Sequence, residues 1–134
     1  MNIEKMLAYM WTFVGCTPYK MGGNVIQDGG LDCSAFVLEG LRSVGKWGRS
    51  DARAQDIYNA GAKLGTVLGL KEITIEPGDI LFFGESDKKI SHVAVALNST
   101  QMIEAGGTDK DGMVRVRPLA WRSDYVGVVR LKLH

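Results

Sequence analysis

The chain changes character at Gly65: segments with helical spacing precede it, and short strand-like runs follow it. After Gly65, runs of β-branched and aromatic residues alternate with turn residues. Helices gathered first and strands second are typical of an α+β fold with an antiparallel sheet. The 134 residues are enough for one domain with a real apolar core. We therefore predict a single domain, residues 1–134, in which N-terminal helices pack on an antiparallel sheet.

Three segments are expected as helices and five as strands. The N-terminal segment presents its apolar residues on one broad face, so we expect it to pack in the core. In the second helix Gly45 supplies a C-terminal stop, and Gly40 is unfavourable unless a neighbour packs closely against it. The N-cap of the third helix is expected at Ser50 or Asp51. The expected helices cover residues 1–14, 33–44 and 52–64, and the expected strands cover residues 80–83, 93–97, 101–105, 113–116 and 126–133.

Composition excludes several classes of partner and cofactor. The formal net charge is +1 and the basic residues are dispersed, so we expect neither nucleic acid nor an anionic membrane as a partner. There is no apolar stretch of about 18 residues and no basic region followed by a small-residue cleavage site, so we expect synthesis in the cytoplasm without a classical secretion signal. The two cysteines are too few for a disulfide framework or a four-cysteine zinc site, and free thiols are favoured over one disulfide. We expect no metal and no organic cofactor.

Cys33 stands where a glycine-rich loop turns into the second expected helix. A cysteine at a helix start lies at the positive end of the helix dipole, beside unsatisfied backbone N–H groups, and both favour the nucleophilic thiolate. A catalytic thiol also needs an imidazole to activate it and to protonate the leaving amine. His134 is the last residue, whereas His92 lies in an expected strand. Cys33 and His92 are therefore the candidate catalytic pair, and Cys16 is interpreted as structural.

Glu104 is the candidate for the group that orients the imidazole. It follows His92 by twelve positions across a short turn, so a hairpin would bring its carboxylate beside the ring and favour the imidazolium. Each of the three residues also has a structural interpretation. A lone cysteine in a small domain is commonly an apolar core residue, a strand histidine is commonly a satisfied structural residue, and Glu104 alone is commonly a solvated strand residue.

Five motifs occur in an informative order. They are residues 18–23 (PYKMGG), 31–37 (LDCSAFV), 77–83 (PGDILFF), 91–95 (SHVAV) and 102–105 (MIEA). Together they resemble the NlpC/p60 family of bacterial cell-wall cysteine peptidases. The resemblance implies a papain-like, NlpC-type fold with the nucleophile at a helix N-terminus. It also implies peptidoglycan stem peptides as substrates, commonly cut between D-γ-glutamate and a diamino acid through a thioester at Cys33.

The resemblance assigns roles to individual residues. The resemblance implies that Asp32 binds substrate. Asp32 also has a second interpretation as the N-cap of the helix, and one side chain is able to do both. Asp79 is interpreted as a turn residue. The third catalytic position is usually histidine in the family, so Glu104 is a departure, although a carboxylate also orients an imidazole. The implied roles are nucleophile for Cys33, general base and acid for His92, oxyanion support for Tyr19, and substrate binding for Asp32 and Ser34.

Three functions stay open from the sequence. The first is a peptidoglycan peptidase, and the second is a related thiol amidase or acyltransferase with the same Cys–His geometry. The third is an inactive relative that acts as a wall-binding or phage tail assembly module. Without a secretion signal, delivery stays open between a phage-encoded lytic or tail-associated enzyme, an effector passed by secretion machinery, a cytoplasmic enzyme that recycles wall peptides, and a fragment of a longer chain. The compact chain favours the phage origin slightly.

Alkylation rates test the identity of the nucleophile. Iodoacetamide at neutral pH should label Cys33 quickly and Cys16 slowly, because only the thiol at a helix start is expected to be held as a thiolate. Peptide mass spectrometry over a time course measures both rates in one sample. Equal rates at the two cysteines would contradict the assignment.

Overall fold

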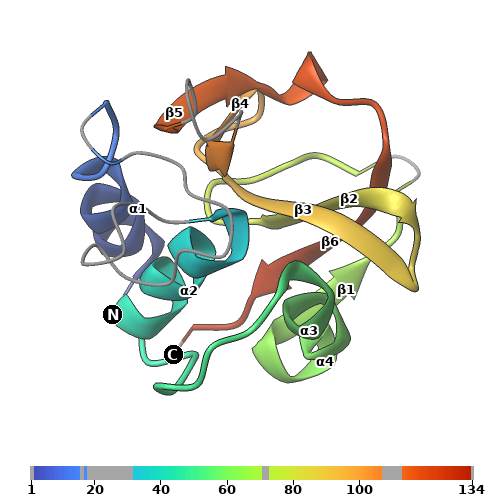
Figure 1. Ribbon diagram of the computed structural model, residues 1–134, viewed down its shortest axis with the longest axis horizontal. Coiled ribbons are helices and arrows are strands. Elements are labelled where there is room, and N and C mark those ends of the chain that lie inside the picture. Colours follow the sequence, from blue (N-terminus) through green and yellow to red (C-terminus); the bar gives the residue numbers. More distant parts are fainter. Residues whose placement is uncertain (1, 16, 18–31, 71–72, 107–112, 134) are drawn as a thin grey trace.

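Helices pack on an antiparallel sheet in the computed structural model, as the sequence predicts (Figure 1). The structure describes residues 2–15, 17, 32–70, 73–106 and 113–133, so Tyr19 and Cys16 lie outside the described residues. The helices are α1 (Ile3–Trp11), α2 (Cys33–Ser43), α3 (Ala54–Asn59) and α4 (Gly61–Leu64). The strands are β1 (Gly65–Leu68), β2 (Ile80–Ser86), β3 (Lys89–Ala96), β4 (Gln101–Gly106), β5 (Met113–Pro118) and β6 (Tyr125–Leu131). No helix in the described ranges is long and apolar enough to span a membrane.

The strands are ordered β1-β6-β2-β3-β4-β5 within the described part of the chain, and every neighbouring pair is antiparallel. Strands β2 to β5 follow one another as a meander, while β6 returns to lie between β1 and β2. The pairing of β3 with β4 covers only Val95 with Ile103 and Ala96 with Met102, although both strands continue. The two strands are therefore joined at their turn end and leave space for side chains at the other end.

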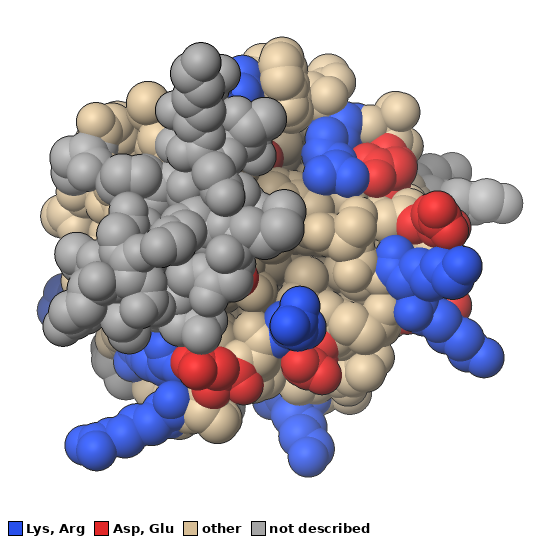
Figure 2. All heavy atoms as spheres, viewed as in Figure 1, with Lys and Arg blue, Asp and Glu red and all other residues tan. Residues whose placement is uncertain are grey.

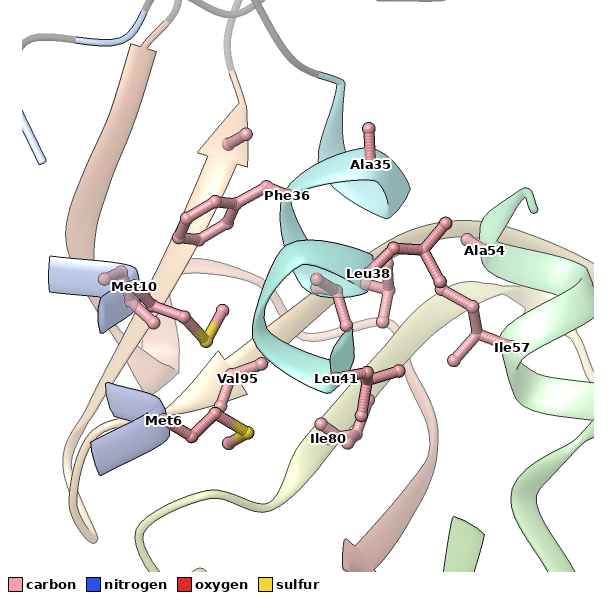
Figure 3. Close-up of a cluster of buried hydrophobic side chains, with 14 of the residues drawn as sticks. Met6, Met10, Ala35, Phe36, Leu38, Leu41, Ala54, Ile57, Ile80 and Val95 are labelled. Atoms are coloured by element: carbon pink, nitrogen blue, oxygen red, sulfur yellow. The ribbon is translucent and has the colours of Figure 1, made fainter. Parts of the chain in front are cut away.

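α2 is the central helix of the core and lies between α1 and α3 over the sheet (Figure 3). Phe36, Leu38 and Leu41 of α2 are fully buried, and burial of each such side chain stabilises the fold by about 1.5–3 kcal/mol. A Cβ added at Gly40 would lie 2.5 Å from Met10 Sδ of α1. The close neighbour that would justify a glycine inside this helix is therefore present.

Both ends of α2 are set by specific hydrogen bonds. At the N-terminus, Asp32 Oδ1 accepts a hydrogen bond from the Ala35 N–H at 2.8 Å. At the C-terminus, Gly45 has φ +73°, and the Lys46 N–H donates to the Leu41 carbonyl at 2.8 Å. This is a Schellman motif, in which glycine tolerates the left-handed conformation. The N-cap and the C-terminal stop predicted from the sequence are both confirmed.

The predicted third helix differs from the observed one. The chain forms α3 and α4, separated at Ala60, and the predicted N-caps Ser50 and Asp51 are wrong. Helix α3 begins directly after its N-cap residue Arg53. The Arg53 N–H donates a hydrogen bond to the carboxylate of Asp56, in the first turn, at 2.9 Å. The short edge strand β1 was not among the predicted strands.

Charge is mixed over the surface. Figure 2 shows positive and negative side chains interspersed on the described part of one face. This agrees with the net charge of +1.

Asp79 is a turn residue, as predicted, and it also anchors β6 to the start of β2. Its side chain is buried, and Arg130 donates to both carboxylate oxygens at 3.0 and 2.9 Å. The same carboxylate accepts the Glu76 N–H at 2.9 Å. The sequence alone did not indicate this ion pair, because its partners are 51 positions apart.

Replacing Asp79 by Asn should lower the free energy of unfolding by about 2 kcal/mol, because Arg130 loses its buried charged partner and keeps only the exposed Glu76 carboxylate, 2.7 Å away. The matched control is Glu85→Gln, which removes an exposed carboxylate that lies 3.6 Å from Lys89. That change should alter stability by less than about 0.5 kcal/mol. Urea unfolding of both variants measures the difference, and equal effects would contradict the anchoring role.

Candidate active site

His92 and Glu104 meet where β3 and β4 are no longer paired. His92 Nε2 and Glu104 Oε1 are 2.9 Å apart, and both side chains are buried. The Phe83 ring packs against the imidazole at a centroid distance of 5.6 Å. The predicted hairpin partnership between His92 and Glu104 is therefore present in the structure.

Cys33 joins this pair from the N-terminus of α2. The residue is half-buried, and its thiol lies within hydrogen-bonding reach of His92. Because Glu104 occupies Nε2 of the ring, Nδ1 is the atom left for the thiol. The three residues share a pocket of about 230 Å³. Three elements thus bring together the thiol, imidazole and carboxylate that the sequence singled out.

The electrostatics of the pocket favour a charged imidazole. Burial works against protonation of His92, but its hydrogen bonds with Cys33 and Glu104 and their negative charges outweigh burial and raise its pKa from 6.5 to about 9. At neutral pH the ring is therefore an imidazolium between a sulfur and a carboxylate. Since folding raises this pKa, the interaction stabilises the fold fully below about pH 6.5, and the contribution is lost as the pH rises through about 9.

Residues that the sequence analysis missed surround Glu104. Arg117 Nε lies 4.0 Å from Glu104 Oε2, and the Arg117 guanidinium stacks over the Trp121 ring at 3.9 Å. Arg115 donates to the Gly106 carbonyl at 3.0 Å. A Cβ at Gly106 would lie 2.6 Å from Glu104 Oε2, so a larger residue there would displace the carboxylate. The alternating arginines of β5 were the available signal, because they pair with the β4 residues around Glu104.

The remaining predicted site residues have mixed outcomes. Asp32 caps α2 and also accepts a hydrogen bond from Ser34 Oγ at 3.0 Å, which confirms the N-cap interpretation. Substrate binding by Asp32 and Ser34 stays a prediction. Tyr19 lies outside the described residues, so its predicted oxyanion role also stays a prediction. In the described ranges, no cluster of histidine, cysteine, aspartate and glutamate side chains is arranged to hold a metal ion.

Comparison with known families agrees with this site and fold. The NlpC/P60 family profile matches residues 16–130, most of the chain. The chain belongs to the NlpC/P60 family. A comparison with curated proteins found no match.

Solved structures of NlpC/p60 domains have the same fold. The NlpC/p60 domain of the peptidoglycan hydrolase SagA aligns with a TM-score of 0.74 at 25% identity, over 98% of this chain and 100% of that one. The peptidoglycan hydrolase RipB from Mycobacterium tuberculosis aligns with a TM-score of 0.74 at 26% identity, over 97% of this chain and 65% of RipB. The chain therefore spans less than two thirds of the RipB structure. The predicted NlpC-type fold is confirmed.

A third relative has been solved in several mutated forms. It is the Resuscitation Promoting Factor Interacting protein RipA, mutated separately at a cysteine, a histidine and a glutamate. The histidine variant aligns with a TM-score of 0.73 at 27% identity, over 98% of this chain and 62% of RipA. The chain spans less than two thirds of the RipA structure as well.

Titration of His92 tests the electrostatics of the pocket. Glu104→Gln keeps a polar partner for the ring but removes the negative charge, so the pKa of His92 should fall, by about one unit or more. NMR titration of the imidazole resonances measures it. Glu85→Gln, which removes an exposed carboxylate, should leave the value unchanged. An unshifted His92 in Glu104→Gln would show that Glu104 does not sustain the imidazolium.

Proposed function

We propose that this NlpC/P60 protein is a cysteine endopeptidase that hydrolyses peptidoglycan stem peptides, at the amide between D-γ-glutamate and a diamino acid. The observation that carries the proposal is the Cys33–His92–Glu104 arrangement, with the thiol at a helix N-terminus and the imidazole charged. The peptidoglycan hydrolases SagA and RipB, which share the fold, support the substrate class. The bond follows from the family resemblance.

The arrangement suits acyl transfer in two steps. The Cys33 thiolate attacks the carbonyl carbon, and the His92 imidazolium gives its proton to the departing amine as the C–N bond breaks. This leaves a thioester between the acyl group and Cys33. Water then attacks the thioester, with His92 accepting its proton, and the thiol leaves as the free acid forms. The first backbone N–H groups of α2 have no partner within the helix and are suited to stabilise the oxyanion.

The position of Glu104 favours an active enzyme over an inactive relative. An orienting carboxylate at 2.9 Å holds the imidazole with Nδ1 toward the thiol. In RipA the mutated histidine and glutamate are twelve positions apart, the same separation as His92 and Glu104. We therefore favour the peptidase over the inactive binding module. The phage origin that the sequence slightly favours, as a lytic or tail-associated enzyme, stays a prediction.

Digestion of purified muropeptides tests the proposal. The wild-type protein should release fragments whose masses place the cut after D-γ-glutamate, and Cys33→Ala should release none, because the nucleophile is absent. Mass spectrometry identifies the products, and circular dichroism confirms that the variant is folded. Intact muropeptides with both proteins would refute the peptidase. A different amide cut only by the wild type would instead support the thiol amidase.

A further inference from the structure

Arg122 lies in the wall of the catalytic pocket, and the proposed reaction does not use it. It lines the pocket together with Cys33 and His92. Asp124 accepts hydrogen bonds from Nε at 2.9 Å and from Nη2 at 2.6 Å, and the guanidinium lies over the Phe83 ring at 5.2 Å. The side chain is therefore held from two sides, in one orientation. No hydrogen bond within the described part of the chain uses Nη1.

Among the described residues that line the pocket, Arg122 carries the accessible positive charge. The buried His92 imidazolium lies between Cys33 and the Glu104 carboxylate, and the same carboxylate faces Arg117. Asp124, the partner of Arg122, has a side chain that is 40% exposed, so water screens its charge. The hydrogen bond with Asp124 is the main reason that the pKa of Arg122 is raised, which keeps the guanidinium charged. Its side chain is 30% exposed.

A fixed guanidinium with a free edge is a typical site for a carboxylate. Its planar N–H donors match the two oxygens of a carboxylate, and such charge-assisted hydrogen bonds are stronger than neutral ones. Trp121, the preceding residue, lines the same pocket and is 56% exposed, so it offers an apolar surface beside the cation. The wall formed by Trp121 and Arg122 thus combines an apolar contact with a carboxylate site.

We propose that Arg122 binds the free α-carboxylate of the γ-linked glutamyl residue whose side-chain carbonyl Cys33 attacks. In a γ-linkage the α-carboxylate is not consumed by the peptide bond, so it remains as an anion near the scissile amide. The site would then select stems with this free carboxylate over stems in which it is amidated. This inference rests on the proposed function, and it names the feature of the substrate that the pocket reads.

A matched pair of stem peptides tests the selection. The peptides differ only in carrying D-γ-glutamate or its α-amide, and kcat/KM is measured for each. Arg122→Gln should lower kcat/KM for the acid about 10- to 100-fold and change it for the amide less than about threefold. For the acid peptide, the kcat/KM of Arg122→Lys should lie between those of the wild type and Arg122→Gln. Lysine keeps the positive charge but lacks the paired N–H donors of the planar guanidinium. Arg49→Gln, the same change at an exposed arginine, should leave both peptides unaffected. An equal loss on both peptides in Arg122→Gln would overturn the proposal.

Alkylation of Cys33 gives a readout that needs no peptide cleavage. Iodoacetate carries a carboxylate and iodoacetamide does not, yet both form the same S–C bond at Cys33 and release iodide. The ratio of the iodoacetate rate to the iodoacetamide rate should fall severalfold in Arg122→Gln and stay constant in Arg49→Gln. A fallen ratio in a protein that cuts no stem peptide would refute the proposed function and keep the carboxylate site. An unchanged ratio in a protein that does cut would refute the carboxylate site alone.

Discussion

The hydrogen bond between the Asp32 carboxylate and the Ala35 N–H is the interaction on which the candidate active site depends. It determines the residue at which α2 begins, and therefore places Cys33 in the first turn. Successive residues of an α-helix are rotated by about 100° around its axis, so a shift of one residue would turn the thiol away from His92. The packing of Phe36 and Leu41 in the core prevents such a shift, because a rotated helix would expose them.

The buried carboxylate of Glu104 is the second constraint on the pocket. Its desolvation is offset by the imidazolium at 2.9 Å, and Arg117 lies at 4.0 Å on its other side. Gly106 leaves the space that the carboxylate occupies. Because β3 and β4 pair at only two positions, the histidine and the glutamate meet between strands that have parted. The incomplete pairing of β3 with β4 thus creates the space in which His92 and Glu104 meet.

The geometry shows how a carboxylate holds the imidazole at the position where the family resemblance led us to expect histidine. The third residue must orient the ring and leave Nδ1 for the thiol, and an acceptor at Nε2 achieves both. A carboxylate also stabilises the imidazolium more strongly than a neutral group does. The hydrogen bond with Cys33, followed by the hydrogen bond and the charge of Glu104, outweighs burial and raises the pKa of His92.

The amino-acid sequence determined the α+β class, the start and end of α2, and the three candidate residues Cys33, His92 and Glu104. These features depend on short-range patterns: helical spacing, a capping aspartate, a terminating glycine and two strands joined by a short turn. The fold decided what lies around them. Arg117 and Arg122 approach the pocket only because β5 pairs with β4 and the chain then turns back toward β6. No local pattern reports such contacts, since they are made between segments that are distant in the sequence and are set by the packing of the whole sheet.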